Sequence, residues 1–136
     1  MAGTPDFADW LAICNLKYAY CRLLDTKDWQ GWGDLFTEDF HQDVSGSGGG
    51  VYQGRAAAVE ATRSAIEIAK TCHQVHNPEI TIEGDEAQAT WALYDRLDWG
   101  GGRTMTGYGH YHERYVKRDG KWRMSEQKLT RLFMEA

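Results

Sequence analysis

The sequence lacks the features that assign a chain to several large classes of protein. Nowhere among its 136 residues do eighteen apolar residues follow one another, so no segment predicts a membrane-spanning helix. Lysine and arginine form no basic run and the formal net charge is -5, which argues against binding to a nucleic-acid backbone. Residues 1–7 contain Asp6 and no apolar run, so we expect neither a secretory signal nor a membrane anchor there.

Motifs that bind phosphates, dinucleotides or catalytic metals are also absent. The sequence has no Walker loop, dinucleotide fingerprint, GxSxG elbow or HExxH pair. Histidines occur in pairs, at His73 and His76 and at His110 and His112, but neither pair has acidic partners at ligand spacing. We therefore expect neither a metal nor a cofactor.

Cysteine is scarce, and its count of three is odd. Cys14 and Cys21 fall in one predicted helix, where a spacing of seven corresponds to about 10 Å of rise, too far for a disulfide. Unpaired cysteines favour a reducing, cytoplasmic setting.

The apolar pattern changes from a helical to a strand period along the chain. Apolar residues three and four apart predict helices over residues 6–24, from Asp28 onward and over residues 54–70, with a short extended piece over residues 40–44. From residue 71 the period is two, which predicts long strands over residues 71–83, 87–99, 104–118 and 122–133. The glycine-rich segment 45–50 has few side chains to pack and is expected to be a flexible loop.

This order of elements predicts a single α+β domain spanning residues 1–136. Three N-terminal helices would cover one face of a mainly antiparallel sheet. Strands of this length twist and curl, so the sheet should close partly around the first helix and leave one cone-shaped apolar pocket.

Polar residues interrupt the apolar stripes of two predicted strands. Asp95 shares a strand face with Trp91, Leu93 and Trp99, and Arg131 shares one with Phe133. Because an unpaired buried charge is costly, these two residues either pair with one another as a structural unit or line a pocket in which Arg131 polarises a substrate oxygen.

The end of the first helix carries a second unusual group. Asp25 lies where the helix dipole disfavours an anion, although it could be a surface turn residue. Tyr20 lies beside the buried stripe of the same helix, where its phenol needs a hydrogen-bond partner or simply packs in the core. A buried histidine beside a carboxylate is the usual way to hold a general base near neutral pH.

Several segments together resemble the SnoaL-like family of the nuclear transport factor 2-like fold. They are residues 16–25, 28–29, 35–39, 73–80, 84–87, 107–111 and 119–122, so that the resemblance covers nearly the whole chain. It implies a cone-shaped α+β barrel. Relatives on this fold include polyketide cyclases, scytalone dehydratase, bile acid 7α-dehydratase and hexachlorocyclohexane dehydrochlorinase, and the last three eliminate water or HCl.

The resemblance implies roles for individual residues. Asp25 and His73 match the Asp and His pair that faces the cavity in these enzymes. Tyr20 matches a tyrosine of the bile acid dehydratase, where the dehydrochlorinase has a lysine, so halide elimination is less supported. Asp95 and Arg131 match polar cavity residues. A second cavity histidine, as in scytalone dehydratase, would be His110 or His112, which strand parity does not decide.

We therefore expect a cofactor-independent, dehydratase-type lyase that acts on an apolar cyclic substrate with one or two oxygens, steroid-, polyketide- or aromatic-like. His73 would act as general base, Asp25 would fix its tautomer and Tyr20 would donate to a substrate oxygen. The pocket wall would comprise Asp95, Arg131, Trp91, Leu93, Trp99, His110 and Phe133.

The sequence is also compatible with functions other than elimination. The same residues could move a proton in an isomerase or cyclase, as ketosteroid isomerase does on this fold, or the pocket could bind a small molecule or serve assembly without turnover. The 45–50 segment could be a flap or a plain surface loop. Relatives are commonly dimers or trimers, and an exposed sheet face bearing Tyr94, Tyr111 and Tyr115 would suit self-association.

Overall fold

The computed structural model describes residues 6–136, so most of the segment that we expect to carry no signal or anchor lies outside the described residues. The helices are α1 (Phe7–Asp25), α2 (Trp29–Gly33), α3 (Arg55–Ile66) and a short 3-10 turn, η1 (Ser45–Ser47). The strands are β1 (Phe36–Asp43), β2 (Val51–Gln53), β3 (Lys70–Glu83), β4 (Glu86–Gly100), β5 (Arg103–Arg118) and β6 (Lys121–Glu135).

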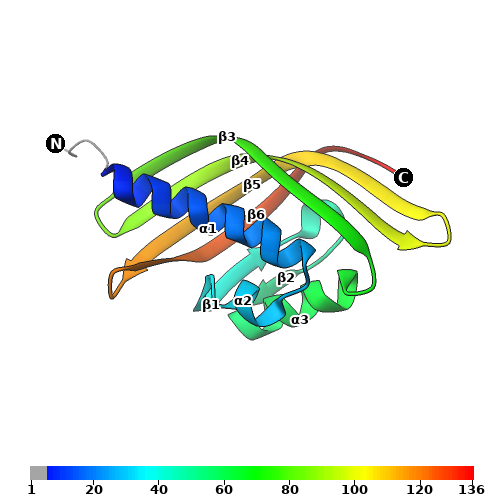
Figure 1. The fold of residues 1–136 in the computed structure, drawn as a ribbon, viewed down its shortest axis with the longest axis horizontal. Coiled ribbons are helices and arrows are strands. Elements are labelled where there is room, and N and C mark those ends of the chain that lie inside the picture. The colour runs from blue at the N-terminus through cyan, green and yellow to red at the C-terminus, as the bar shows by residue number, and fades with distance from the viewer. Residues whose placement is uncertain (1–5) are drawn as a thin grey trace.

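The strands form one curved sheet in the order β2-β1-β6-β5-β4-β3, in which only β1 and β6 are parallel neighbours. Helix α1 lies across one face of the sheet, which we call the inner face, while α2 and α3 lie at the β1 and β2 end (Figure 1). The sheet does not close into a full barrel. The predicted α+β class, three helices against a curved and mainly antiparallel sheet, is confirmed.

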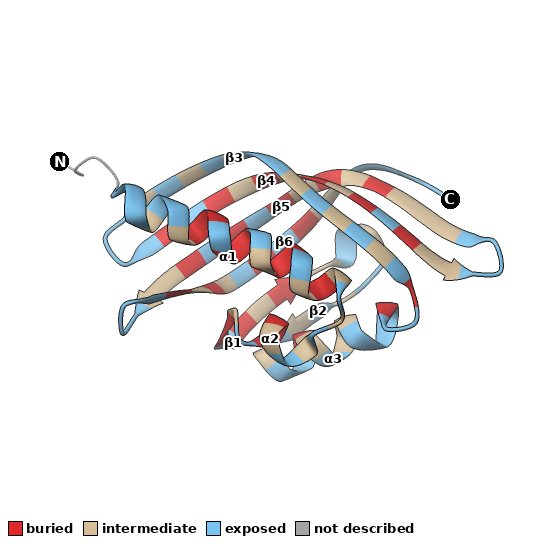
Figure 2. Cartoon of the chain, in the orientation of Figure 1, coloured by how far each residue is buried: buried red, intermediate tan, exposed pale blue. Residues whose placement is uncertain are grey.

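Local sequence explains where α1 begins and what it buries. Asp6 caps the helix by accepting a hydrogen bond from the Ala8 amide at 2.8 Å. Residues three and four apart, including Ile13, Tyr20 and Leu24, face the sheet and join one core that Figure 2 shows as a buried stripe running along the helix and strands. Burial of this stripe fixes α1, and with it the position of Asp25, against the sheet.

The four long strands match their predicted ranges within two residues, but the segment before them differs. Strand β1 begins at Phe36, earlier than expected, and the short strand β2 was not expected at all. The 45–50 segment is a closed turn in which the amides of Val44 and Ser47 donate to Gly50 and Val44 carbonyls, respectively. The segment that we expected to be an irregular loop is therefore a hydrogen-bonded turn, in which backbone hydrogen bonds replace the missing side-chain contacts.

The expectation for the outer face of the sheet is also wrong. Tyr111 pairs with Trp91 and Tyr115 with Ala87, so both tyrosines point inward and are buried. Tyr94 does point outward, where it packs against Tyr108 with ring centroids 5.5 Å apart. Strand parity alone could not align β4 with β5, because the register across the hairpin decides which residues share a face.

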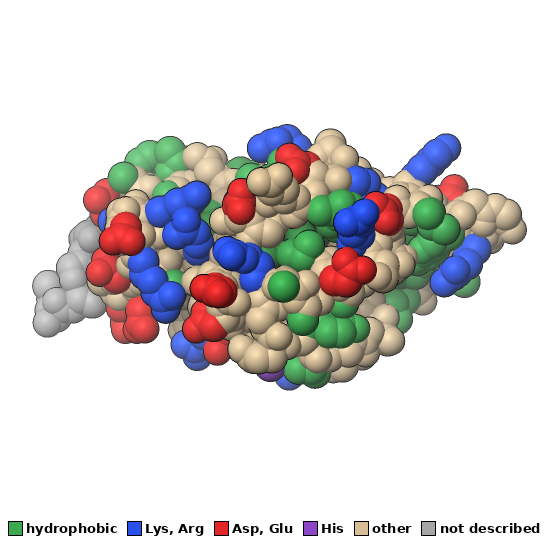
Figure 3. Space-filling model, turned by 90° about the horizontal axis from the view of Figure 1, so that it is seen from below, with side chains coloured by type: hydrophobic (Ala, Val, Ile, Leu, Met, Phe, Trp, Pro, Cys, Tyr) green, Lys and Arg blue, Asp and Glu red, His purple; other side chains and the backbone are tan. Residues whose placement is uncertain are grey.

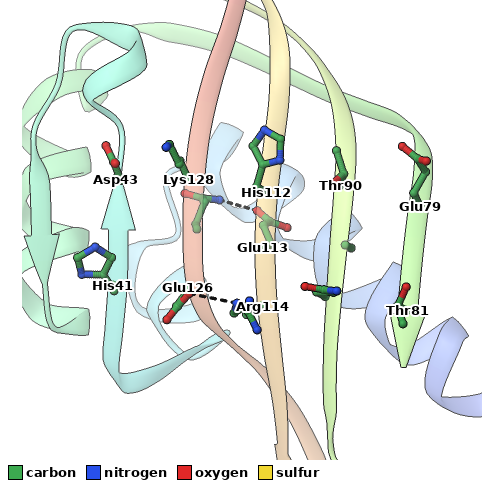
Figure 4. Close-up of a pocket in the computed structure, with 13 residues that line it drawn as sticks. His41, Asp43, Glu79, Thr81, Thr90, His112, Glu113, Arg114, Glu126 and Lys128 are labelled. Atoms are coloured by element: carbon green, nitrogen blue, oxygen red, sulfur yellow. Dashed lines mark hydrogen bonds and ion pairs between the residues drawn. The ribbon is translucent and has the colours of Figure 1, made fainter. Parts of the chain in front are cut away.

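A part of the outer face is polar. Two rows of side chains cross the strands there and line a hollow of about 540 Å³ (Figure 4). One row runs through Asp43, Lys128, His112, Thr90 and Glu79, which are neighbours in register. On the molecular face seen in Figure 3, basic and acidic side chains are interspersed and form no large patch of one sign.

Candidate functional site

Helix α1 ends at the point where β3 passes beside it, and this brings Asp25 and His73 together. One oxygen of the Asp25 carboxylate, Oδ1, lies 2.7 Å from Nδ1 of His73. The other, Oδ2, accepts a hydrogen bond from the His73 backbone amide at 2.9 Å. The Thr71 hydroxyl donates to Oδ1 at 2.9 Å. The carboxylate is therefore held by three donors from a single strand.

These contacts determine the ionisation of Asp25. Partial burial would raise the pKa of the carboxyl, but the hydrogen bonds from His73 and Thr71 outweigh it and lower the pKa below its ordinary value. Because an ionised carboxylate can only accept, we assign the ring proton of His73 to Nδ1. In a neutral ring with this tautomer Nε2 carries the lone pair, and this nitrogen lies 3.9 Å from Oδ2 of Asp95.

A second pair, Asp95 and Arg131, lies on the same inner face. Arg131 donates from Nη1 and Nη2 to the two oxygens of Asp95, at 2.7 and 2.9 Å. The side chains are 4% and 7% exposed, so both charges are almost fully buried. The pair bridges β4 and β6 over the intervening strand β5, where Gly107 leaves room for it, since a Cβ atom there would collide with both side chains.

The remaining edge of Arg131 contacts the η1 turn. Its Nε and Nη2 atoms donate to the hydroxyl of Ser47 at 3.2 and 3.1 Å. The site as a whole runs from Thr71 through Asp25 and His73 to Asp95, Arg131 and Ser47. Its side chains come from elements that are far apart in the sequence, namely α1, β3, β4, β6 and η1.

Tyr20, the third residue with a predicted catalytic role, lies in a neighbouring network. Its ring packs against Trp32, Phe36 and Tyr111, and its hydroxyl donates to Oε1 of Gln127 at 3.3 Å. Burial, followed by the charge of Glu113, raises the pKa of Tyr20 far above its ordinary value, so the phenol stays protonated. No hydrogen bond joins it to Asp25 or His73 among the described residues.

Two of the predicted wall residues face the opposite side of the sheet. Phe133 is 52% exposed and stacks on Tyr108 of the outer face, because Leu132 is an unpaired extra residue that reverses the alternation of β6 after Arg131. His110 pairs with Ala92 and Thr130, so it also faces outward, as does His112. Neither histidine of this pair lies on the face that carries His73.

The other three predicted wall residues point inward with different surroundings. Leu93 is buried one step from Asp95 on the same face of β4. Trp91 is fully buried, and its indole donates to the hydroxyl of Tyr115 at 3.0 Å. Trp99 lies near the end of β4 and donates to the carbonyl of Ala65 at 3.0 Å, which ties this end of the strand to α3.

Sequence reasoning missed a buried ion pair in the core. Nζ of Lys17 lies 2.7 Å from Glu113, and neither side chain is exposed. Lys17 also lies 3.6 Å from the ring centroids of Tyr20 and Tyr111. Burial lowers the pKa of Lys17, and the charge of Glu113 opposes this. Glu113 is the sequence feature that could have indicated this pair, because it lies between two tyrosines on the inward-facing side of β5.

The surface beside the Asp25 and His73 pair is hollowed. A groove of about 540 Å³ between α1 and β3 is lined by Tyr18, Cys21, Arg22, Asp25, His73, Gln74, Val75 and His76. It is open and partly polar, unlike the enclosed apolar pocket that we expected. Within residues 6–136 no cluster of three or more His, Cys, Asp or Glu is arranged to hold a metal ion, and no helix there is long and apolar enough to cross a membrane.

Comparisons with known proteins place this geometry in context. Residues 5–128 match the family of SnoaL-like domains. A structure described as a proposed aromatic ring hydroxylase from Novosphingobium aromaticivorans is 26% identical, with a TM-score of 0.90 over 97% of this chain and 95% of that chain. A proposed scytalone dehydratase from the same species is 21% identical, with a TM-score of 0.86 over 95% of this chain and 87% of that one.

A hexachlorocyclohexane dehydrochlorinase, LinA type 2, is 17% identical. Its TM-score is 0.85 over 95% of this chain and 88% of that chain. At these identities the last two structures show the fold alone. The predicted nuclear transport factor 2-like fold is confirmed.

Proposed function

The chain belongs to the SnoaL-like domain family, whose fold is shared by dehydratases and dehydrochlorinases, and from this premise we propose that it is a cofactor-independent lyase. Its substrate would be an apolar cyclic molecule of the steroid, polyketide or aromatic type. One observation carries the proposal: Asp25 contacts Nδ1 of His73 at 2.7 Å, so that in the neutral ring the lone pair lies on Nε2, beside the Asp95 and Arg131 pair.

In the proposed reaction His73 takes a proton from a carbon next to a substrate carbonyl through Nε2. The negative charge of Asp25 stabilises the imidazolium that forms, while Arg131 stabilises the negative charge that develops on the carbonyl oxygen. The electron pair then forms a carbon–carbon double bond and expels the hydroxyl group on the next carbon. That group leaves as water with the proton returned from His73, so the enzyme ends the cycle unchanged.

Tyr20 has a supporting role in this proposal. Because its phenol stays protonated, it can donate a hydrogen bond to a substrate oxygen but cannot act as a base. To do so it would exchange its present bond to Gln127, which at 3.3 Å is long for a hydroxyl donor.

The test is solvent deuterium incorporation into cyclic hydroxyketones in D₂O, followed by mass spectrometry and NMR, with wild type, His73→Gln and His76→Gln. His76 is the matched control because it lines the same groove but its ring is exposed and contacts no carboxylate in the described structure. We expect His73→Gln to lose about a hundredfold or more of the exchange rate and His76→Gln to retain it.

The products separate the related activities. Loss of water identifies a lyase, a moved double bond identifies an isomerase, and ring closure identifies a cyclase. Exchange that is equal in wild type and His73→Gln would contradict the proposal and leave a small-molecule-binding or assembly module as the better description.

We also propose that residues 1–136 act as one domain that forms a homo-oligomer, a dimer or trimer, in the cytoplasm. No helix of the described residues covers the outer sheet face, and this face carries an aromatic row in which Tyr94 and Tyr108 are half-buried and Phe133 is exposed. Free thiols at Cys14, Cys21 and Cys72 favour a reducing compartment. Light scattering of wild type and Phe133→Ser tests the assembly, which we expect the substitution to weaken.

A further inference from the structure

The guanidinium of Arg131 has two edges with different occupants. The Nη1 and Nη2 edge is taken by the carboxylate of Asp95. The Nε and Nη2 edge presents two parallel N–H donors, and among the described residues these meet the hydroxyl oxygen of Ser47 alone, at 3.2 and 3.1 Å. The oxygen of a half-buried neutral side chain thus occupies a position with two parallel donors, which suits a stronger acceptor.

The turn that supplies Ser47 is held together independently of Arg131. Within it, the amide of Gly48 donates to the Ser45 carbonyl at 3.1 Å, and the Ser45 hydroxyl donates to Asp43 at 2.6 Å. The side chain of Ser47 points out of the turn, where it contacts Arg131 and, at 3.8 Å, the sulfur of Met134. Ser47 can therefore leave Arg131 without unfolding the turn, because the bonds lost are few and weak.

Charge decides which ligand suits the freed edge. Asp95 already balances the positive charge of Arg131, and Asp25 adds a further negative charge on the far side of His73. A ligand carboxylate would lie next to Asp95 and be repelled, whereas an uncharged carbonyl oxygen would not. The hydroxyl of Ser47 is itself an uncharged acceptor.

Building on the proposed function, we propose that the Nε and Nη2 edge of Arg131 binds the neutral carbonyl oxygen of a ketone substrate, and that Ser47 occupies this site until the substrate displaces it. The site lies close to the base, since Asp95 contacts both Arg131 and, at 3.9 Å, Nε2 of His73. The proposal requires that the carbon next to the bound carbonyl face Nε2 of His73. Negative charge reaches the oxygen only as His73 becomes positive, so the net charge of the site stays constant.

The experiment compares acetophenone, a neutral ketone, with benzoate, a carboxylate of nearly the same shape. Binding is followed through the Arg131 Nε–H signal in ¹⁵N-labelled protein, in wild type, Ser47→Ala and Ser45→Ala. The last variant is the matched control, because Ser45 lies in the same turn but bonds Asp43 instead of Arg131.

We expect acetophenone to shift the Arg131 signal and to bind about fivefold more tightly to Ser47→Ala than to wild type. This factor follows if Ser47 occupies the Arg131 edge in about four-fifths of the wild-type molecules. Ser45→Ala should match wild type, and benzoate should bind at least about tenfold more weakly than acetophenone. Unchanged or weaker ketone binding in Ser47→Ala, no shift of the Arg131 signal, or preferred binding of benzoate would each overturn the inference.

Deuterium uptake by the acetophenone methyl group separates this inference from the proposed function. If acetophenone binds as expected but gains no deuterium, the site assignment stands and the proposed chemistry fails. If deuterium is gained while Ser47→Ala behaves as wild type, the chemistry stands and the role of Ser47 is refuted.

Discussion

Replacing Asp25 with Asn tests the base that the proposed chemistry requires. The carboxylate accepts three hydrogen bonds, from the Thr71 hydroxyl, the His73 amide and Nδ1 of His73. An asparagine side chain has one acceptor oxygen and one NH₂ donor in the same positions, so it cannot accept all three. If the asparagine oxygen keeps the hydrogen bond from the His73 amide, the NH₂ group faces the His73 ring, and Nδ1 must then accept a hydrogen bond from it. The ring proton then moves to Nε2, the atom that must be free.

The expected loss follows from this change of tautomer. General-base catalysis contributes about 10²- to 10⁴-fold, and the corresponding substitution in a Ser-His-Asp triad costs about 10⁴-fold. We expect deuterium exchange to fall by at least about a hundredfold. The fold should lose only about 1–2 kcal/mol, since one charge-assisted hydrogen bond is removed and Asp25 is partly exposed.

Long-range ¹H–¹⁵N spectra of the His73 ring report the tautomer directly, and the exchange rate is measured on the same samples. Asp28→Asn is the control, because Asp28 caps α2 through the Gly31 amide and does not touch His73. If Asp25→Asn keeps the proton on Nδ1 and loses less than about tenfold in rate, the reasoning about the pair is refuted.

Three further perturbations have expected outcomes. Burial raises the pKa of Asp25, but its hydrogen bonds outweigh burial and lower the folded-state pKa below the unfolded value of about 3.9. The contribution of Asp25 to stability is therefore present above the unfolded pKa and is lost as pH falls through the folded-state pKa. Urea unfolding between about pH 5 and 2 should show this loss in wild type and not in Asp25→Asn. Glu113→Gln leaves Lys17 buried without its anion and should cost about 3–5 kcal/mol in the free energy of unfolding, partly recovered in the double variant with Lys17→Met. Because burial lowers the pKa of Lys17, the deficit of Glu113→Gln should shrink as pH rises toward the ordinary lysine value, and a deficit that grows would contradict this. Gly107→Ala places a methyl group against Asp95 and Arg131, so acetophenone affinity should fall at least about tenfold while far-ultraviolet circular dichroism stays unchanged.

The fold was largely predictable because its signals are local. The four long strands alternate in polarity over a dozen residues or more, and the turns between them contain glycine at positive φ, as at Gly84 and Gly120. Strand β2 has three residues and no alternation to detect, so it was missed. The packing of η1 was also missed, because it depends on backbone bonds that leave no pattern in side-chain polarity.

The site was predictable only in part, because its contacts depend on register. Alternation placed Arg131 on the inner face, but the same rule put Phe133 there too, and the unpaired Leu132 reverses it. The partner of Lys17 was not predictable either, because Glu113 is 96 positions away. The register of the assembled sheet decides which strand residue contacts a given turn of the helix. This register cannot be read from a single sequence.

Three polar contacts spaced along α1 help to hold the helix, and with it Asp25, in place on the sheet. Asp9, Lys17 and Asp25 are spaced eight residues apart, about 12 Å of rise and a rotation of about 80° at each step. Asp9 accepts from Lys117 and Trp122, near the β5–β6 turn, Lys17 contacts Glu113 of β5, and Asp25 contacts His73 of β3. The rotation carries the contacts from one side of the sheet to the other as the helix crosses it. The middle contact is the fully buried one, so the Lys17 and Glu113 pair adds to the burial of the apolar stripe in fixing α1, and with it Asp25, against the sheet.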